Sequence, residues 1–185
     1  ENKVVKKQEN IYKLGQLLNI KAPVRIEAFD NSNLFGEYPV SAMVCFVNGI
    51  KSPKDYRKYH VKTVEGANDY ATMKEVIYRR YYRLMIEDGV MPDLIIMDGG
   101  IIQVNACLEV LSSLNLDIPV LGLKKDDNHK TNVLYFNGAT ISLAKNDDLY
   151  LFLANIQEAV HEFAISFFRN TKAKGMFLSR LDGIK

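Results

Sequence analysis

The spacing of hydrophobic and polar residues changes along the chain, and these changes predict the order of its elements. Residues 3–18 carry apolar side chains at helical spacing, which predicts an amphipathic helix. Apolar runs at 24–30 and 40–47 and an alternating run at 56–61 are short and are separated by turn residues. Three such runs joined by short turns predict an antiparallel meander of three strands.

The rest of the chain alternates helical and strand patterns. Asn68 or Asp69 is suited to cap a helix. The run at 94–97 has no polar alternation, as in a central strand that is covered on both faces. The predicted elements are a helix to about residue 88, a strand at 94–97, a helix from 99 to 114, a strand at 119–123, a charged loop at 124–130, a hairpin of strands 132–136 and 139–143, and a helix from Asp147 to about Arg169.

This order of elements predicts the fold class. Three antiparallel strands followed by helix, strand, helix and strand form the ribonuclease H-like arrangement, an α/β fold. Its mixed sheet has antiparallel strands 1-2-3 and parallel strands 1-4-5 and is flanked by helices. A doubly wound nucleotide-binding domain would instead alternate strands and helices from its start. Because the first strand lies beside the fourth in the ribonuclease H-like order, the ends of these two strands should be neighbours.

Two aspartates stand at these two strand ends. Asp30 closes the first strand and Asp98 closes the fourth, and turn residues follow each of them. A carboxylate at a strand end is poorly solvated and costs free energy unless it is paired or holds a cation. Each aspartate could cap its own turn, but their expected adjacency favours a shared divalent cation. Mg²⁺ and Mn²⁺ prefer such oxygen ligands, and divalent ions can promote phosphodiester hydrolysis.

His161 is the third candidate for this site. The last predicted helix is mostly apolar, and His161 lies on its one polar stripe with Gln157, Glu158 and Glu162. A histidine can complete a cation site or move protons near neutral pH. A single histidine on such a stripe is also common as a structural or solvated residue, so spacing alone leaves its role open.

Composition narrows the class of protein without identifying a partner. The chain has 185 residues, of which 48% are hydrophobic and 25% charged, as in an ordinary globular domain. Its net charge of +2 neither requires nor opposes a nucleic-acid partner. Cys45 and Cys107 lie far apart in apolar runs, which predicts two buried, reduced thiols of a cytoplasmic protein. No apolar run is long enough to span a bilayer, so we expect no membrane partner.

Several charged residues are candidates for supporting roles. Arg79 and Arg80 fall on one predicted helix and could contact phosphate groups, although a solvated helix face is the alternative. Lys124 and Lys125 follow a buried strand, toward the same sheet edge as the other strand ends. Glu27 is expected on the face of its strand opposite to the strand-end carboxylate, where it could support the site or pair with an arginine.

Five motifs occur in the chain in an order that resembles a known family. They are Arg25-Ile26-Glu27-Ala28-Phe29-Asp30-Asn31-Ser32, Asp55-Tyr56-Arg57-Lys58, Asp69-Tyr70-Ala71-Thr72-Met73, the run from Pro92 to Gly100 with Gln103, and His161-Glu162-Phe163-Ala164-Ile165. They resemble the C-terminal endonuclease half of UvrC, the nuclease subunit of bacterial UvrABC excision repair. The resemblance covers nearly all of residues 20–172.

The resemblance implies a catalytic triad and a reaction. Asp30, Asp98 and His161 are the expected catalytic residues and the expected ligands of Mg²⁺ or Mn²⁺. The implied reaction is a metal-dependent incision of the damaged strand on the 5′ side of the lesion. The implied partners are damaged double-stranded DNA and, for the full-length protein, the UvrB–DNA complex, whose contact region lies upstream of this chain in the family.

Other candidates surround this triad. We expect Glu27 and Glu158 to support the cation ligands. Arg57, Lys58 and Arg169 lie in basic clusters and join Arg79, Arg80, Lys124 and Lys125 as expected DNA contacts. Several positions depart from the family pattern and put the local affinity for DNA in doubt: Asn33, Ile101, Ile102, Ala159, Val160, Glu162 and Phe168.

The resemblance also divides the chain and leaves alternatives. Residues 1–19 are expected to form an N-terminal helix and linker, 20–172 the endonuclease domain, and 173–185 a linker toward the family's helix-hairpin-helix module. The alternatives are another ribonuclease H-like nuclease, similar to endonuclease V or to a junction resolvase, or a non-catalytic DNA-binding module of the same fold.

Overall fold

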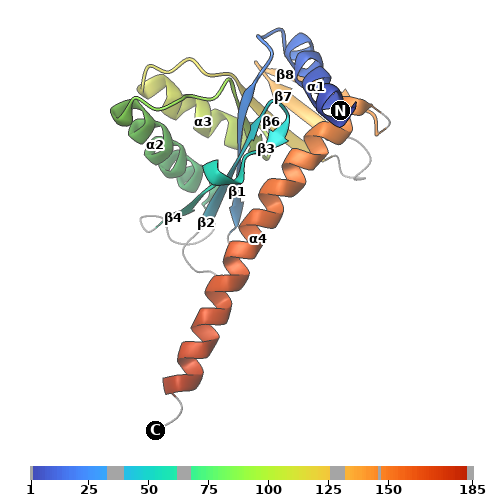
Figure 1. The fold of residues 1–185 in the computed structure, drawn as a ribbon. Coiled ribbons are helices and arrows are strands. Elements are labelled where there is room, and N and C mark those ends of the chain that lie inside the picture. The colour runs from blue at the N-terminus through green and yellow to red at the C-terminus, as the bar shows by residue number, and fades with distance from the viewer. Residues whose placement is uncertain (1, 33–39, 62–67, 126–131, 146, 183–185) are drawn as a thin grey trace.

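The structure of the chain, a computed structural model, is an eight-stranded sheet with helices on both faces (Figure 1). It describes residues 2–32, 40–61, 68–125, 132–145 and 147–182. Side chains are described within 4–31, 40–61, 68–124, 133–145 and 147–166.

The strand order confirms the predicted sheet. β1 (Arg25–Ser32) is antiparallel to β2 (Val40–Val47) and parallel to β5 (Leu94–Asp98). β5 is parallel to β6 (Val120–Lys125), and β4 (Arg57–His60) is antiparallel to β2. The predicted strands 1-2-3 and 1-4-5 are therefore β1-β2-β4 and β1-β5-β6. The predicted hairpin, β7 (Asn132–Phe136) and β8 (Ala139–Leu143), extends the sheet beyond β6.

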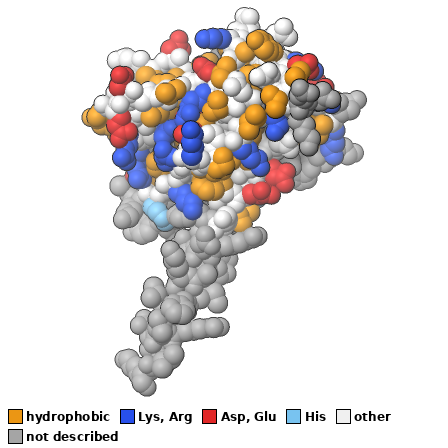
Figure 2. All heavy atoms as spheres, viewed as in Figure 1, with side chains coloured by type: hydrophobic (Ala, Val, Ile, Leu, Met, Phe, Trp, Pro, Cys, Tyr) orange, Lys and Arg blue, Asp and Glu red, His pale blue; other side chains and the backbone are white. Residues whose placement is uncertain are grey.

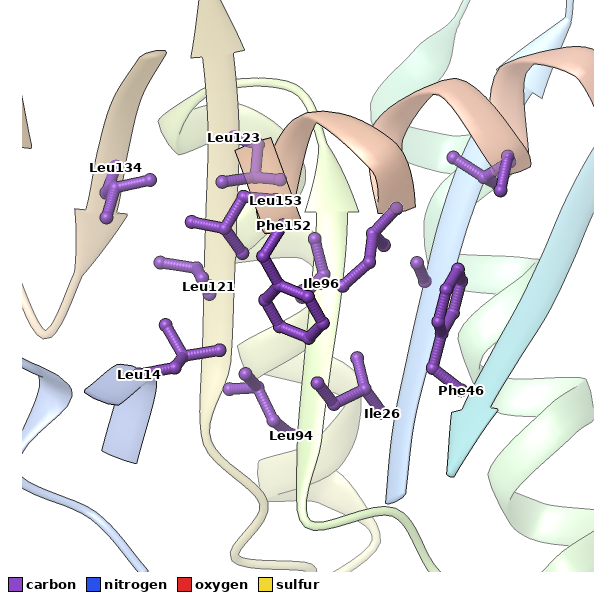
Figure 3. Packing of buried hydrophobic residues seen from close by; sticks show 14 of the residues in the cluster. Leu14, Ile26, Phe46, Leu94, Ile96, Leu121, Leu123, Leu134, Phe152 and Leu153 are labelled. Carbon is purple, nitrogen blue, oxygen red and sulfur yellow. The ribbon is translucent and has the colours of Figure 1, made fainter. Parts of the chain in front are cut away.

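Helices cover the two faces of the sheet (Figure 1). α1 (Asn2–Leu18) and α4 (Asp148–Asp182) lie on one face, and α2 (Asp69–Glu87) and α3 (Ile101–Ser113) lie on the other. Each face buries its own core, because alternate residues of each central strand point to opposite faces. Figure 3 shows the first of these cores, in which side chains of α1 and α4 pack over the central strands: Leu14, Ile26, Phe46, Leu94, Ile96, Leu121, Leu123, Leu134, Phe152 and Leu153.

The segment between β2 and β4 is more structured than the sequence pattern predicts. The turn at Asn48-Gly49 was predicted, and both residues have positive φ, 54° and 77°. It leads into an unpredicted two-residue strand, β3 (Ile50–Lys51), and then into a single 3₁₀ turn over Pro53–Asp55. Two residues are too short a run to show a period, so β3 could not be found from the pattern.

The last helix is longer than predicted. We expected it to end near Arg169, but α4 continues to Asp182 and extends beyond the sheet (Figure 1). Residues 173–182, expected to form a linker, are helical, and 183–185 lie outside the described residues. The segment has no proline, and Ala, Lys, Leu, Met and Arg favour helix, so only Gly175 opposes its continuation.

Two predictions drawn from composition can be compared with the structure. Cys45 and Cys107 are buried and are not joined in a disulfide, as predicted. Burial raises the pKa of the Cys45 thiol to about 11. None of the helices within the described ranges combines the length and the apolar character that a bilayer-crossing segment needs.

Gly122 lets the turn after β5 approach β6. A side-chain carbon added at Gly122 would lie 2.6 Å from Cγ2 of Val104 and 3.0 Å from the carbonyl oxygen of Gly99. We therefore expect Gly122→Ala to lower the free energy of unfolding by about 1–3 kcal/mol, as in other overpacked cores. Urea unfolding measures this, and Gly100→Ala is the control, because its added carbon would approach nothing closer than 3.6 Å. Equal effects of the two substitutions would contradict the packing argument.

Candidate active site

Asp30 and Asp98 are neighbours at one edge of the sheet. β1 and β5 run parallel, and the last pair in their register is Phe29 with Met97, so each aspartate is the next residue along its strand. Ala28 and Ile96 belong to the core beneath α4. Because side chains alternate along a strand, Asp30 and Asp98 point to this same face. The adjacency expected from the element order is therefore present.

The surroundings of Asp30 disfavour its negative charge. Asp30 is only 9% exposed. Burial, and after it the charge of Asp98, raises the pKa of Asp30 to about 7, although the nearby His161 acts in the opposite direction.

α4 brings two polar side chains to the aspartates from successive turns. Nδ1 of His161 lies 3.5 Å from Oδ2 of Asp30, and the imidazole is 60% exposed. One turn earlier, Nε2 of Gln157 donates a hydrogen bond of 2.7 Å to Oδ1 of Asp98. The helix is held in place by neighbouring residues that are buried against the sheet, among them Ile156 and Val160. The three residues expected as a triad are thus brought together.

Gln157 was not among the predicted site residues, whereas its neighbour Glu158 was. Gln157 lies four residues before His161, so the two share a helix face. This spacing was visible in the sequence, but glutamine alone has no signature of a site. Glu158 is exposed and lines a cleft of about 870 Å³ between α1 and α4, away from the hydrogen bond to Asp98.

Glu27 and Arg80 form an ion pair on the opposite face of the sheet. Glu27 is fully buried and accepts hydrogen bonds from Arg80 Nε (3.2 Å) and Nη2 (3.0 Å). Tyr81 (2.8 Å) and Arg25 (3.1 Å) donate to the same carboxylate. Glu27 therefore pairs with an arginine, which is one of the two roles that the sequence left open for it. The guanidinium of Arg80 is buried against Glu27 and is only 9% exposed, which favours a structural role, and its contact with DNA stays a prediction.

Lys58 lies on the same face of the sheet as the aspartates. Ala42 of β2 pairs with Asp30 on one side and with Lys58 on the other. Residues directly opposite in antiparallel strands share a face, so Lys58 lies two strands, about 10 Å, from Asp30. Its Nζ lies 5.2 Å from the ring centre of Phe163, two residues after the histidine on α4.

The other basic residues that were expected to contact DNA lie on different elements of the fold. Arg57 is exposed and donates to the carbonyl oxygens of Lys54 and Tyr56. Arg79, on α2, donates to the carbonyl oxygen of His60 (2.7 Å). The exposed Lys124 reaches the turn after β5, with its Cδ close to Gly100. Figure 2 shows Lys and Arg side chains gathered toward the α2 side of the face in view. The side chains of Lys125 and Arg169 lie outside the described residues.

The positions that depart from the family pattern differ in their exposure and in the part of the fold where they lie. Ile101 and Ile102, at the start of α3, are 55% and 59% exposed. Ala159 and Val160 are buried residues of α4, and Glu162 of the same helix lines the α1–α4 cleft. Asn33 lies outside the described residues, as does the side chain of Phe168.

The donor set suits a hard divalent cation. Carboxylate oxygens and an imidazole nitrogen are common ligands of Mn²⁺, and Mg²⁺ favours the oxygens. Among the residues that the structure describes, no three His, Cys, Asp or Glu side chains form a preorganised metal site.

Comparison with known proteins is consistent with this geometry. The family model of the UvrC RNase H endonuclease domain matches residues 15–165. The chain is 52% identical to the UvrABC system protein C of Streptococcus gordonii and 51% identical to that of Streptococcus thermophilus, in each case over its full length. It spans 31% and 32% of those proteins.

Solved structures show a more distant likeness. Endonuclease V of Ciona intestinalis, in complex with inosine-containing DNA, is 14% identical with a TM-score of 0.43. The match covers 68% of this chain and 59% of that one. The family assignment rests instead on the matched domain and on the close relatives, and the chain belongs to the UvrC RNase H endonuclease domain family.

Proposed function

We propose that the chain is a divalent-metal-dependent endodeoxyribonuclease domain that makes the 5′-side incision of a damaged DNA strand. The observation that carries this proposal is the convergence of Asp30, Asp98 and His161 at one sheet edge. The chain spans about a third of the curated relatives it matches, so the activity of the whole protein is part of the proposal. Damaged DNA and the UvrB–DNA complex are its proposed partners.

Asp30 and Asp98 would hold Mg²⁺ or Mn²⁺, and His161 would complete the site. When bound, such a cation lowers the pKa of the attacking water and stabilises negative charge on the phosphate group. Its positive charge would also favour the ionised form of Asp30, whose pKa is raised by burial and, after it, by the charge of Asp98.

The side chains of the protein have their own parts in the reaction. Where His161 serves proton transfer instead of completing the cation site, its imidazole would take the proton of the attacking water as a general base. The exposed imidazole can then release that proton to solvent. Lys58, on the same face, would attract the DNA backbone toward the aspartates, and Lys124 would do so beside the turn after β5.

A chimera tests the proposed reaction. This chain replaces the matching segment of the Streptococcus gordonii protein, and the chimera is incubated with UvrA, UvrB, Mg²⁺ and a lesion-containing duplex. We expect a 5′-side incision that is absent from the Asp98→Asn chimera and no cleavage of a four-way junction. Retention of the 5′ incision in Asp98→Asn would refute the assignment. Preferential junction cleavage would indicate a resolvase instead.

A further inference from the structure

Gln157 contacts one of the two aspartates but has no part in the reaction described above. Its Nε2 lies 2.7 Å from Oδ1 of Asp98. Its Oε1 is buried and has no hydrogen-bond partner among the described residues. A buried amide oxygen without a partner costs free energy, about 1–3 kcal/mol in typical cases. The residue is therefore not explained by the stability of the fold alone.

The chemistry of Asp98 determines which way the amide faces. An ionised carboxylate has only acceptor atoms, so the amide must turn its NH₂ group toward Asp98 and its oxygen away. The unpaired Oε1 follows directly from this orientation. It leaves one acceptor beside the carboxylate pair, where a donor such as a water molecule would satisfy it.

α4 fixes the position from which Gln157 acts. Ile156 and Val160, on either side of it in the sequence, are buried against the sheet. The amide is thus presented by a rigid element rather than by a loop. Hydrogen bonds of this kind orient cation ligands, and their loss typically weakens metal binding or activity by about 10–100-fold.

We infer that Gln157 is a positioning residue, which holds the Asp98 carboxylate in the orientation needed to bind a divalent cation. The inference rests on the proposed function, because it assumes that Asp98 is a cation ligand. Gln157 acts only through Asp98 in this inference.

Mn²⁺ binding, measured by isothermal titration calorimetry, tests the inference. Gln157→Met keeps the length of the side chain and its helix propensity but removes the amide. We expect Mn²⁺ to bind the variant roughly 10–100-fold more weakly. We also expect its cleavage activity to recover as the Mn²⁺ concentration is raised. Gln157→Asn, one methylene shorter, should behave in the same way, because its amide no longer reaches Asp98.

Asn155→Met is the matched control. Asn155 carries the same amide on the same helix, but it is exposed and lines the α1–α4 cleft. We expect it to bind Mn²⁺ as the unaltered chain does. A merely structural role for Gln157 would lower the melting temperature of both Gln157 variants and leave their Mn²⁺ affinity unchanged, and this result would overturn the inference.

The two proposals fail in distinguishable ways. If the unaltered chain and Asn155→Met bind Mn²⁺ and Gln157→Met binds it equally well, the positioning role is wrong and the metal site stands. If the unaltered chain does not bind Mn²⁺ at all, the proposed function and the positioning role are both wrong. Circular dichroism of each variant shows that the comparison is between folded proteins.

Discussion

Asp30→Asn is expected to abolish cleavage and, in the same molecule, to stabilise the metal-free domain. Loss of a cation ligand should reduce the cleavage rate by more than the roughly 10–100-fold that removal of an outer hydrogen-bond partner causes. The gain in stability has a separate cause. Above about pH 7 the unaltered protein must keep a carboxylate ionised where burial and the charge of Asp98 oppose it.

The pH dependence of this gain follows from the direction of the pKa shift. The pKa of Asp30 rises from 3.8 to about 7 on folding, so between these values the folded state holds a proton that the unfolded state releases. Stability from this group is therefore full below pH 3.8 and is lost as pH rises to about 7. Asparagine cannot ionise, so Asp30→Asn should be more stable at pH 8 by on the order of 2–4 kcal/mol.

Urea unfolding between pH 4 and pH 8 without metal measures this difference. The advantage of Asp30→Asn should grow with pH and become constant above about 7. Adding Mn²⁺ should stabilise the unaltered protein and leave Asp30→Asn unchanged. Asp117→Asn, at an exposed position, is the control and should alter neither property. A stability difference that does not vary with pH would contradict the assigned environment of Asp30.

The adjacency of Asp30 and Asp98 could be predicted because it depends on topology alone. The order of helices and strands determines which strands are neighbours, and each aspartate ends its strand. Period and turn residues supply that order, as in the hairpin around Asn137-Gly138, whose strand bounds are as predicted. His161 needed the family resemblance, because its place on a polar stripe did not show which strand end the helix would reach.

Contacts between a helix and a strand could not be predicted in the same way. They depend on how far each helix is rotated about its axis and where it crosses the sheet. Arg79 and Arg80 are adjacent, yet a rotation of about 100° per residue leaves Arg79 half exposed and buries Arg80 on Glu27. The same geometry brings Gln157 rather than Glu158 to Asp98. Charge alone had not distinguished Arg79 from Arg80, and it had suggested Glu158 instead of Gln157.

The burial of Arg80 leads to the second large effect, a loss of stability in Arg80→Met. Glu27 is fully buried, and Arg80 makes two hydrogen bonds to it. Methionine would leave that charge with Tyr81 and the partly exposed Arg25 as its remaining partners. Breaking a buried ion pair by removing one partner typically costs about 3–5 kcal/mol, and we expect Arg80→Met to fall in this range.

The double substitution of Glu27→Gln with Arg80→Met measures the interaction between the two side chains apart from their contacts with other residues. Because glutamine removes the buried charge, the double variant should be more stable than Arg80→Met alone, and the double-mutant cycle gives the coupling energy. Arg79→Met is the matched control on the same helix, and we expect a cost within about 1 kcal/mol, as for other exposed ion pairs.

These variants also decide between a structural and a DNA-binding Arg80. If Arg80 contacts phosphate, Arg80→Met should bind DNA more weakly and keep the same free energy of unfolding. If Arg80 forms a core ion pair, the variant should lose free energy of unfolding and bind DNA as before. The unfolding of Arg80→Met is measured in urea, and its DNA affinity is measured under conditions where circular dichroism shows it folded. Arg80 joins α2 to β1, the strand that carries Asp30 on its other face. A folded Arg80→Met that binds DNA normally would show that Arg80 is not a phosphate contact.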